Sequence, residues 1–246
     1  MKPPTFWLRN SFLLLLLIAA TFASGCVYLR LLQFKNQLAD FEKHFAADLS
    51  DGFRINCKDP VLMGEDLRWL GAEPETIKKV PGGESWTVRW VKELPRGVTE
   101  NGIYDVELHA DLVERRLQSV YIPERYFAFV PKTLFLDALR SAGHAKIDRQ
   151  SHQAVMKTSD DTADASSPVE LNSVQKMLGV PTELIADSSL SRYRYVFRPQ
   201  CPTGTGKSVE VTFIFNTKSG NLVRLIGKLP KGTLDFEFPE PAVTKK

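Results

Sequence analysis

Two stretches of this 246-residue chain carry the same landmarks in the same order, and this internal repeat limits the folds available to the chain. Each stretch contains a short helix-like segment that ends in Leu-Gly, at Leu70-Gly71 and again at Leu178-Gly179, a displacement of 108. Glycine supplies the left-handed backbone conformation that commonly ends a helix. A repeat of this length indicates one supersecondary unit that is used twice.

Strand-like segments follow the helix in both copies. They cover residues 86–90, 104–108, 117–123 and 126–131 in the first copy, and 193–197, 209–213, 222–226 and 234–239 in the second. Alternation of side chains, as at Tyr193, Tyr195 and Phe197, predicts strands with one buried face. We therefore expect an α+β protein with two tandem modules, each a short helix packed on a small antiparallel sheet. The modules are placed at residues 53–131 and 169–240.

The region between the modules, residues 132–168, divides into two parts. Residues 133–140 have the apolar spacing of a helix, whereas residues 158–167 are polar, acidic and without periodicity. The second part is expected to be a linker.

The N-terminus has the layout of a targeting segment. Lys2 and Arg9 precede an apolar run that begins at Phe12, and Ser24-Gly25-Cys26 follows it. This order in the segment 1–26 resembles the bacterial lipoprotein signal, which implies cleavage directly before Cys26 and lipidation of Cys26 as the new N-terminal residue. The alternative is an uncleaved membrane anchor, because residues 12–29 contain no charge and are just long enough to span a thin bilayer. Both alternatives place the rest of the chain outside the cytoplasmic membrane, tethered to a bilayer.

Residues 27–52 are predicted to form a membrane-proximal amphipathic helix. Its apolar side chains recur at steps of three and four and form a stripe, which consists of Leu31, Phe34, Leu38, Phe41 and Phe45. The stripe either packs on the protein's own domain or binds a partner or a second copy.

Two cysteines remain if Cys26 is lipidated. Cys57 and Cys201 are an even pair in an oxidising compartment, so a disulfide between the modules is one alternative and two unpaired thiols are the other. The sequence does not show whether the Cα atoms come within bonding distance.

No known catalytic, metal-binding or nucleotide-binding pattern is complete. The segment Cys201–Ser208 ends like a phosphate-binding loop, but a strand pattern follows where a helix is required, so a hairpin loop is predicted. The four histidines have no metal-ligand spacing, and no Gly-x-Ser-x-Gly occurs. We therefore predict no enzyme, no cofactor, no metal and no small-molecule substrate.

Composition and charge exclude further classes. With 43% hydrophobic and 25% charged residues, the chain is neither disordered nor a multi-span membrane protein. The net charge of +3 comes from Lys2, Arg9 and Arg30, because the remaining 29 basic residues are balanced by 29 acidic ones. No basic stripe is left that would favour nucleic acid.

The second module also resembles a known family. Its Leu178-Gly179-Val180-Pro181-Thr182, the aromatic strand 193–195 and the segments 209–215 and 220–223 are similar to the SmpA/OmlA (BamE-like) module, and β-lactamase-inhibitor-protein modules look similar too. The resemblance implies helices packed on a small antiparallel sheet and binding to other proteins without chemistry. Lipoprotein members of that family assist outer-membrane protein assembly.

The expected function is therefore protein–protein interaction by a membrane-tethered protein that faces the periplasm of a bacterial envelope. The partners would be the membrane, through the N-terminal lipid or helix, and an envelope protein. An inhibitory module against a secreted enzyme is the first alternative. An enzyme with a site between the modules is the second.

Overall fold

The computed structural model describes residues 27–100, 104–128, 131–148, 153–157, 169–204 and 206–238. The segment 1–26 with its lipidation residue Cys26 lies outside the described residues, as do residues 158–168 of the expected linker. Among the helices that are described, none is long and apolar enough to cross a membrane.

The chain begins with helices and a hairpin. Residues 27–39 form a helix, called the N-terminal helix below, and α2 (Phe41–His44), β1 (Phe45–Asp48) and β2 (Phe53–Cys57) follow. The predicted helix of 27–52 is therefore too long, because it ends at residue 44. Beyond that point the backbone pairs with β2 in an antiparallel register, with Phe45 opposite Cys57. The stripe still forms one apolar surface although the helix ends earlier, because Phe41 and Phe45 pack in the same core.

The first half contains a helix and a four-stranded meander. Its elements are α3 (Gly64–Leu70), β3 (Thr76–Val80), β4 (Gly83–Lys92), β5 (Asp105–Val113), β6 (Arg116–Ile122) and the 3₁₀ helix η1 (Glu124–Phe127). The strand predicted at 126–131 is wrong for its described residues, because Tyr126 and Phe127 belong to η1, which begins directly after Pro123. The turn directs Phe127 into the core, where its ring stacks 5.6 Å from that of Phe53.

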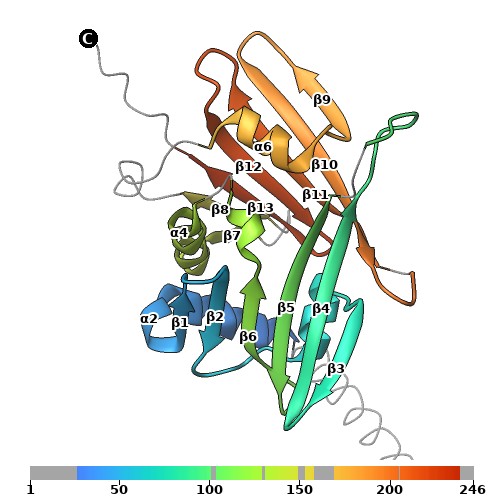
Figure 1. Ribbon diagram of the computed structural model, residues 1–246. Coiled ribbons are helices and arrows are strands. Elements are labelled where there is room, and N and C mark those ends of the chain that lie inside the picture. Colours follow the sequence, from blue (N-terminus) through green and yellow to red (C-terminus); the bar gives the residue numbers. More distant parts are fainter. Residues whose placement is uncertain are drawn as a thin grey trace, which may run out of the picture.

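The second half repeats this order of one helix and four strands, and then has a fifth strand where the first half has η1. It contains α6 (Leu171–Leu178), β9 (Glu183–Ala186), β10 (Leu190–Gln200), β11 (Val209–Asn216), β12 (Leu222–Leu229) and β13 (Gly232–Glu237). Between the halves lie α4 (Lys132–Gly143), which confirms the predicted helix, and two strands that the sequence did not predict, β7 (Lys146–Asp148) and β8 (Gln153–Lys157). Figure 1 shows the first half below and the second half above.

All strands in the described part of the chain belong to one sheet, whereas two separate small sheets were expected. The order is β1-β2-β6-β5-β4-β10-β11-β12-β13-β8-β7, with β3 paired to β4 and β9 paired to β10. Every pairing is antiparallel except that of β13 with β8. The sheet is continuous because β4 uses its second half to pair with β10.

The pairing pattern of the first half recurs in the second. Thr76 pairs with Thr87 in β3–β4, and Glu183 pairs with Arg194 in β9–β10, so both hairpins match at a displacement of 107. Even an irregularity recurs, because the register shifts after Asp111 in β5 and after Ile214 in β11. The two halves therefore share strand order, register and a bulge.

The junction of the halves has a local two-fold relation. Val91 pairs with Arg198, its own counterpart at the displacement of 107. On either side, Trp90 pairs with Pro199 and Lys92 pairs with Phe197. At the same displacement, Pro199 is the counterpart of Lys92 and Phe197 is the counterpart of Trp90. An antiparallel pairing of this kind places a two-fold axis between Val91 and Arg198.

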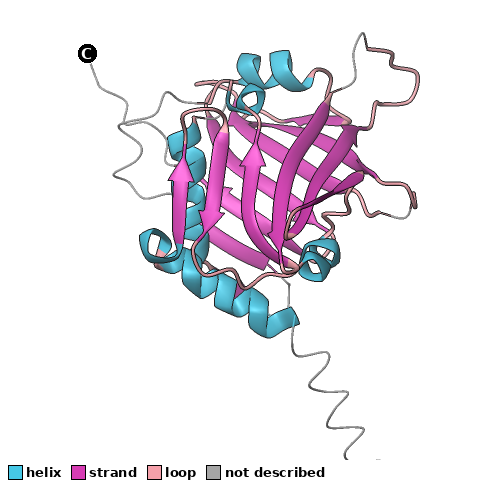
Figure 2. Cartoon of the chain, turned by 60° about the horizontal axis from the view of Figure 1, so that its bottom comes forward, coloured by secondary structure: helices cyan, strands magenta, loops and turns pink. Residues whose placement is uncertain are grey.

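Two hydrophobic cores lie on the same side of the sheet. The first is closed by the N-terminal helix, α2, α3 and α4, and the second by α6. The buried residues at their centres are Leu38, Phe41, Phe45, Phe53, Trp86, Leu112 and Leu117 in the first, and Val174, Leu178, Tyr193, Tyr195, Phe213 and Phe215 in the second. Figure 2 shows the helices outside the curved sheet.

Candidate interaction surface

The side of the sheet opposite the two cores carries many polar side chains, together with the buried Val196 and Ile214. Successive residues of a strand point to opposite faces, so Trp86 and Val88 are buried while Thr87 and Arg89 point to this second side. We call it the open face. It is built by half-buried or exposed side chains of β2, β4, β5, β6, β10, β11 and β12: Arg54, Thr87, Arg89, Asp105, Glu107, His109, Asp111, Tyr121, Arg192, Arg194, Arg198, Glu210, Thr212 and Lys228.

A row of side chains crosses the open face of the first half. The guanidinium carbon of Arg54 lies 4.8 Å from the centre of the Tyr121 ring, and the His109 ring stacks on Tyr121 at 5.8 Å. Thr87 Oγ1 and His109 Nδ1 are 3.4 Å apart. Because these residues are direct neighbours across β2, β6, β5 and β4, the row is part of the sheet's own register.

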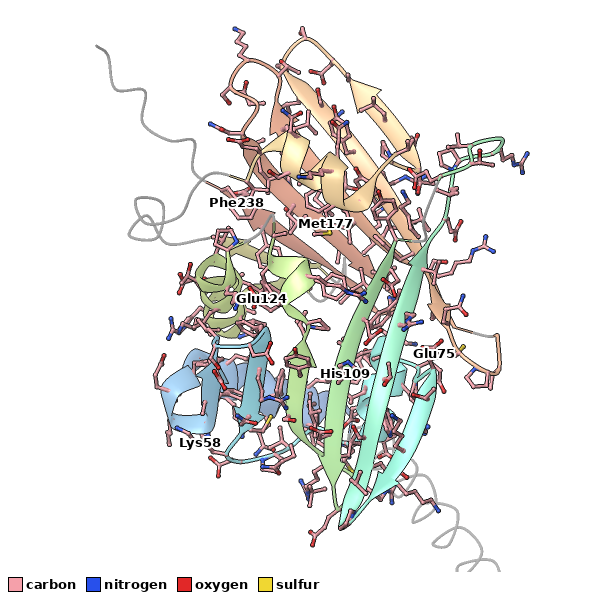
Figure 3. The ribbon with its side chains drawn as sticks, viewed as in Figure 1. Lys58, Glu75, His109, Glu124, Met177 and Phe238 are labelled. Atoms are coloured by element: carbon pink, nitrogen blue, oxygen red, sulfur yellow. The ribbon has the colours of Figure 1, made fainter. Side chains whose placement is uncertain are left out.

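Charged groups surround this row. Arg89 Nη2 donates to Glu107 Oε2 at 2.7 Å, and Arg89 Nε lies 3.2 Å from Asp105 and 3.6 Å from Glu75. His109 Nε2 lies 2.9 Å from Glu107 Oε1. Figure 3 places His109 over the strands of the first half and Glu75 at their side. The charged side chains are therefore held in fixed positions by one another.

Glu107 is the best-buried carboxylate of this cluster, with 15% of its side chain exposed. Burial acts to raise its pKa, but the hydrogen bond from Arg89 and the electrostatic interactions with Arg89, His109 and Arg125 outweigh it, so the pKa is lowered below its usual value. The backbone N–H of Glu107 donates to the Tyr126 hydroxyl at 2.8 Å, which closes the edge of β5 beyond β6.

The second half continues the pattern with other residues. Arg194 Nε donates to Glu183 at 2.7 Å, and Arg194 also lies 3.3 Å from Glu210. Glu210 in turn lies 3.5 Å from Lys228. Arg198, 71% exposed, pairs with Glu93 next to the two-fold junction. Positive and negative groups thus alternate over both halves, and neither sign dominates.

Beneath the junction lies a buried ion pair. The Lys92 side chain is 1% exposed, and its ammonium donates to Glu100 Oε2 at 2.6 Å and to the carbonyls of Leu178 at 2.6 Å and Val180 at 3.1 Å. It also lies 4.5 Å from the centre of the Tyr104 ring. All three N–H groups of the ammonium therefore have an acceptor, and the end of β4 is bound to the end of α6.

No disulfide joins Cys57 and Cys201, which was one of the two alternatives for these cysteines. Cys57 lies in the first core, whereas Cys201 lies in the loop between β10 and β11, where its Sγ is 3.5 Å from Thr203 Oγ1. Burial raises the pKa of the Cys57 thiol to about 11, so the thiol stays protonated at neutral pH.

The predicted stripe is a core element. Leu38, Phe41 and Phe45 are 8%, 3% and 2% exposed, and Leu31 and Phe34 pack against the same core. The first of the two alternatives for this stripe is therefore the one observed: these five side chains pack in the protein's own core.

The structure also bears on the glycine-rich segment 201–208 and on metal-ligand groups. The segment Cys201–Ser208, apart from Thr205, forms the loop between β10 and β11, as predicted, because the strand β11 follows it. Within the described ranges, no group of three His, Cys, Asp or Glu side chains is arranged to hold a metal ion.

The sequence alone indicates which residues can lie on the open face, but not which of them lie side by side. Arg89, Glu107 and Tyr121 are the polar positions of alternating strands, but their clustering depends on the strand register. Lys92 had no such signal, because it stands at an inward position of the series Trp86, Val88, Trp90.

Comparison with known proteins places the chain in no family: no family model, curated protein or solved structure matches it.

Proposed function

We propose that this protein is tethered to a membrane of the bacterial envelope by its N-terminal segment and binds another protein through the open face. The observation that carries the proposal is the face itself. Its arginine and tyrosine side chains are partly exposed and are held in place by their neighbours, as in the cation–π contact of Arg54 with Tyr121 and the ion pair of Arg89 with Glu107. Arginine and tyrosine are the residue types that most often dominate binding energy at protein interfaces.

The charge pattern indicates the kind of partner. Arg89, Arg194 and Lys228 alternate with Asp105, Glu107 and Glu210, so a polyanion such as nucleic acid would meet repulsive carboxylates. A folded protein surface with both charge signs can pair with such a pattern. Preformed ion pairs also lower the cost of ordering these side chains on binding.

We further propose that the two halves are tandem copies of one module. The shared hairpin register, the repeated bulge and the two-fold pairing at Val91 and Arg198 support this reading. Such an arrangement would result if a single module first formed a symmetric dimer by pairing the strand that is now β4 with the same strand of a second copy. Duplication of the module would then have joined the two copies in one chain, with β10 as the second of these strands. The duplicated module provides one broad face in place of two small ones.

The tether is the other part of the proposal. The apolar segment after Lys2 and Arg9, with Ser24-Gly25-Cys26 at its end, supports either lipidation of Cys26 or an uncleaved anchor. A role in outer-membrane assembly or envelope maintenance follows from the resemblance of the second module to BamE-like proteins, which act by binding and not by catalysis.

Gentle chemical cross-linking of intact cells, followed by detergent extraction, tests the proposal. The wild-type chain should migrate in a complex with a second protein, and Arg89→Glu should weaken that complex. Lys58→Glu, on the side of the helices, should leave it intact. A chain that always migrates alone would contradict the function.

A further inference from the structure

Apolar side chains are exposed at the beginning of the N-terminal helix. Tyr28, Leu29 and Leu32 are 60%, 66% and 47% exposed, although Leu31 and Phe34 on the other side of the helix pack into the first core. Adjacent exposed apolar residues in a soluble surface usually mark a contact with a partner or a membrane.

The exposed side of this helix changes character along its length. It is apolar at Tyr28, Leu29 and Leu32, and it is polar from Gln33 through Asn36 to Asp40. At 1.5 Å per residue, the apolar part extends about 6 Å along the helix axis. This is comparable to the depth, about 5–10 Å, to which amphipathic helices enter the headgroup region of a bilayer.

Two other residues, the half-buried Trp69 and the exposed Lys231, lie next to this apolar area on the body of the protein. Trp69 of α3 contacts Tyr28 edge-to-face, with ring centres 5.7 Å apart, and Lys231 lies 4.9 Å from the centre of the Trp69 ring. Lys231 belongs to the turn between β12 and β13 and is exposed. The chain therefore brings a tyrosine, a tryptophan and a lysine together from three distant segments.

The helix is fixed to the body directly behind these residues. Arg30 Nε donates to Asp66 Oδ2 at 2.6 Å and Arg30 Nη2 donates to Asp66 Oδ1 at 2.7 Å, with Asp66 fully buried. Asp66 also accepts from the backbone N–H of Met63 at 2.8 Å. A two-pronged pair of this kind fixes direction as well as distance. The start of the helix cannot swing away from α3 without breaking it.

We propose that Tyr28, Leu29, Leu32, Trp69 and Lys231 form a membrane-contact patch that lies in the headgroup region of the bilayer to which the chain is tethered. This inference rests on the proposed tether, because the charge-free residues 12–26 precede the patch directly in the sequence. Tyrosine and tryptophan are favoured at this depth, and Lys231 would meet lipid phosphate. The patch and the Arg30–Asp66 pair together set the orientation of the body on the membrane.

Tryptophan quenching by brominated lipid tests the patch. The chain contains Trp7, Trp69, Trp86 and Trp90, so the full chain is used with Trp7→Phe and is reconstituted at one chain or fewer per vesicle. The vesicles contain phosphatidylcholine and phosphatidylglycerol with bromine near the headgroup. We expect the amount of emission that the brominated lipid removes to fall by roughly half or more on Trp69→Phe and to be unchanged on Trp90→Phe, because Trp90 packs against the second core.

A matched pair of variants on the N-terminal helix sharpens the test. Leu32→Asp and Gln33→Asp both place a carboxylate at an exposed position, but only the first lies in the patch, so only the first should reduce quenching of Trp69.

Flotation of the chain with vesicles distinguishes the proposed patch from the proposed tether. A chain that floats with vesicles while Trp69 is not quenched overturns the patch and leaves the tether, whereas a chain that does not float overturns both. Quenching that needs several chains per vesicle assigns the patch to a second copy and overturns the membrane contact.

Discussion

Lys92 and Glu100 form an ion pair of 2.6 Å that is almost completely removed from solvent, with 1% and 11% of the two side chains exposed. Glu100 uses its other oxygen to accept from the backbone N–H of Val180 at 2.6 Å. The pair therefore joins the first half of the sheet to the end of α6 in the second half. The open face above it depends on this junction, because β4 and β10 meet there.

Removing the lysine charge should destabilise the protein strongly. Lys92→Met leaves the buried Glu100 carboxylate and two carbonyls without their donor, so we expect the free energy of unfolding to fall by about 3–5 kcal/mol. Urea unfolding of the full chain in detergent measures it. Lys78→Met, on the exposed strand β3, should change the value by less than about 0.5 kcal/mol. Equal effects of the two substitutions would show that the buried pair does not hold the halves together.

Both the backbone conformation at position 179 and the atoms around it favour glycine there. It has φ of +66°, and a Cβ at this position would lie 2.6 Å from Glu100 Oε1 and 2.9 Å from the Tyr104 ring. Gly220 has a similar φ of +71° but open space around it. Gly220→Ala should therefore cost the backbone strain alone, about 1 kcal/mol, and Gly179→Ala should cost clearly more. Comparison of the two urea midpoints decides this, and equal midpoints would remove the steric part of the argument.

The lowered pKa of Glu107 predicts a pH dependence of stability. A carboxyl whose pKa is lower in the folded than in the unfolded state stabilises the fold above its unfolded value, 4.5, and this contribution is lost as pH falls through the folded pKa. Glu107→Gln removes it. We expect the wild type to lose more stability than the variant between about pH 6 and pH 3, by up to about 1 kcal/mol. Parallel curves for the two proteins would contradict the role assigned to Arg89 and Glu107.

The Arg30–Asp66 pair should control the order of the N-terminal helix. Asp66→Asn keeps an oxygen for the Met63 N–H but removes the negative charge that faces Arg30. We expect faster amide hydrogen exchange in residues 27–39, and unchanged exchange in α6 as the internal control, because a hydrogen bond to a charged group contributes about 1.5–3 kcal/mol. Unchanged exchange at the N-terminal helix would show that core packing alone holds it.

The α+β class and most of the elements of both halves could be predicted from the sequence, because alternation and helical spacing depend on which side chains are buried. Trp86 and Val88, and Tyr193 and Tyr195, show it directly. The strands β3 and β9 were missed because all of their residues are exposed, so they lack the alternation of burial that marks a strand. Their pairing with β4 and β10 is determined by tight turns and register.

The continuous sheet and the open face could not be predicted from local patterns. The pairing of Val91 with Arg198 joins residues 107 positions apart, and nothing near either residue specifies the other. The surroundings of the stripe from Leu31 to Phe45 could not be predicted from local patterns either. Its spacing predicts an apolar face, but not whether that face packs on the protein itself or on a partner.

Site-specific photo-cross-linking in living cells tests the central claim, binding through the open face, most directly. A photoreactive residue is placed at Thr87 or Arg194 on this face, and at Lys58 or Lys176 on the side of the helices as matched controls for the two halves. We predict that both open-face positions cross-link to the same envelope protein, that the adducts weaken with Glu107→Arg, and that neither control yields them. Adducts to that protein from Lys58 or Lys176, with none from Thr87 or Arg194, would contradict the account.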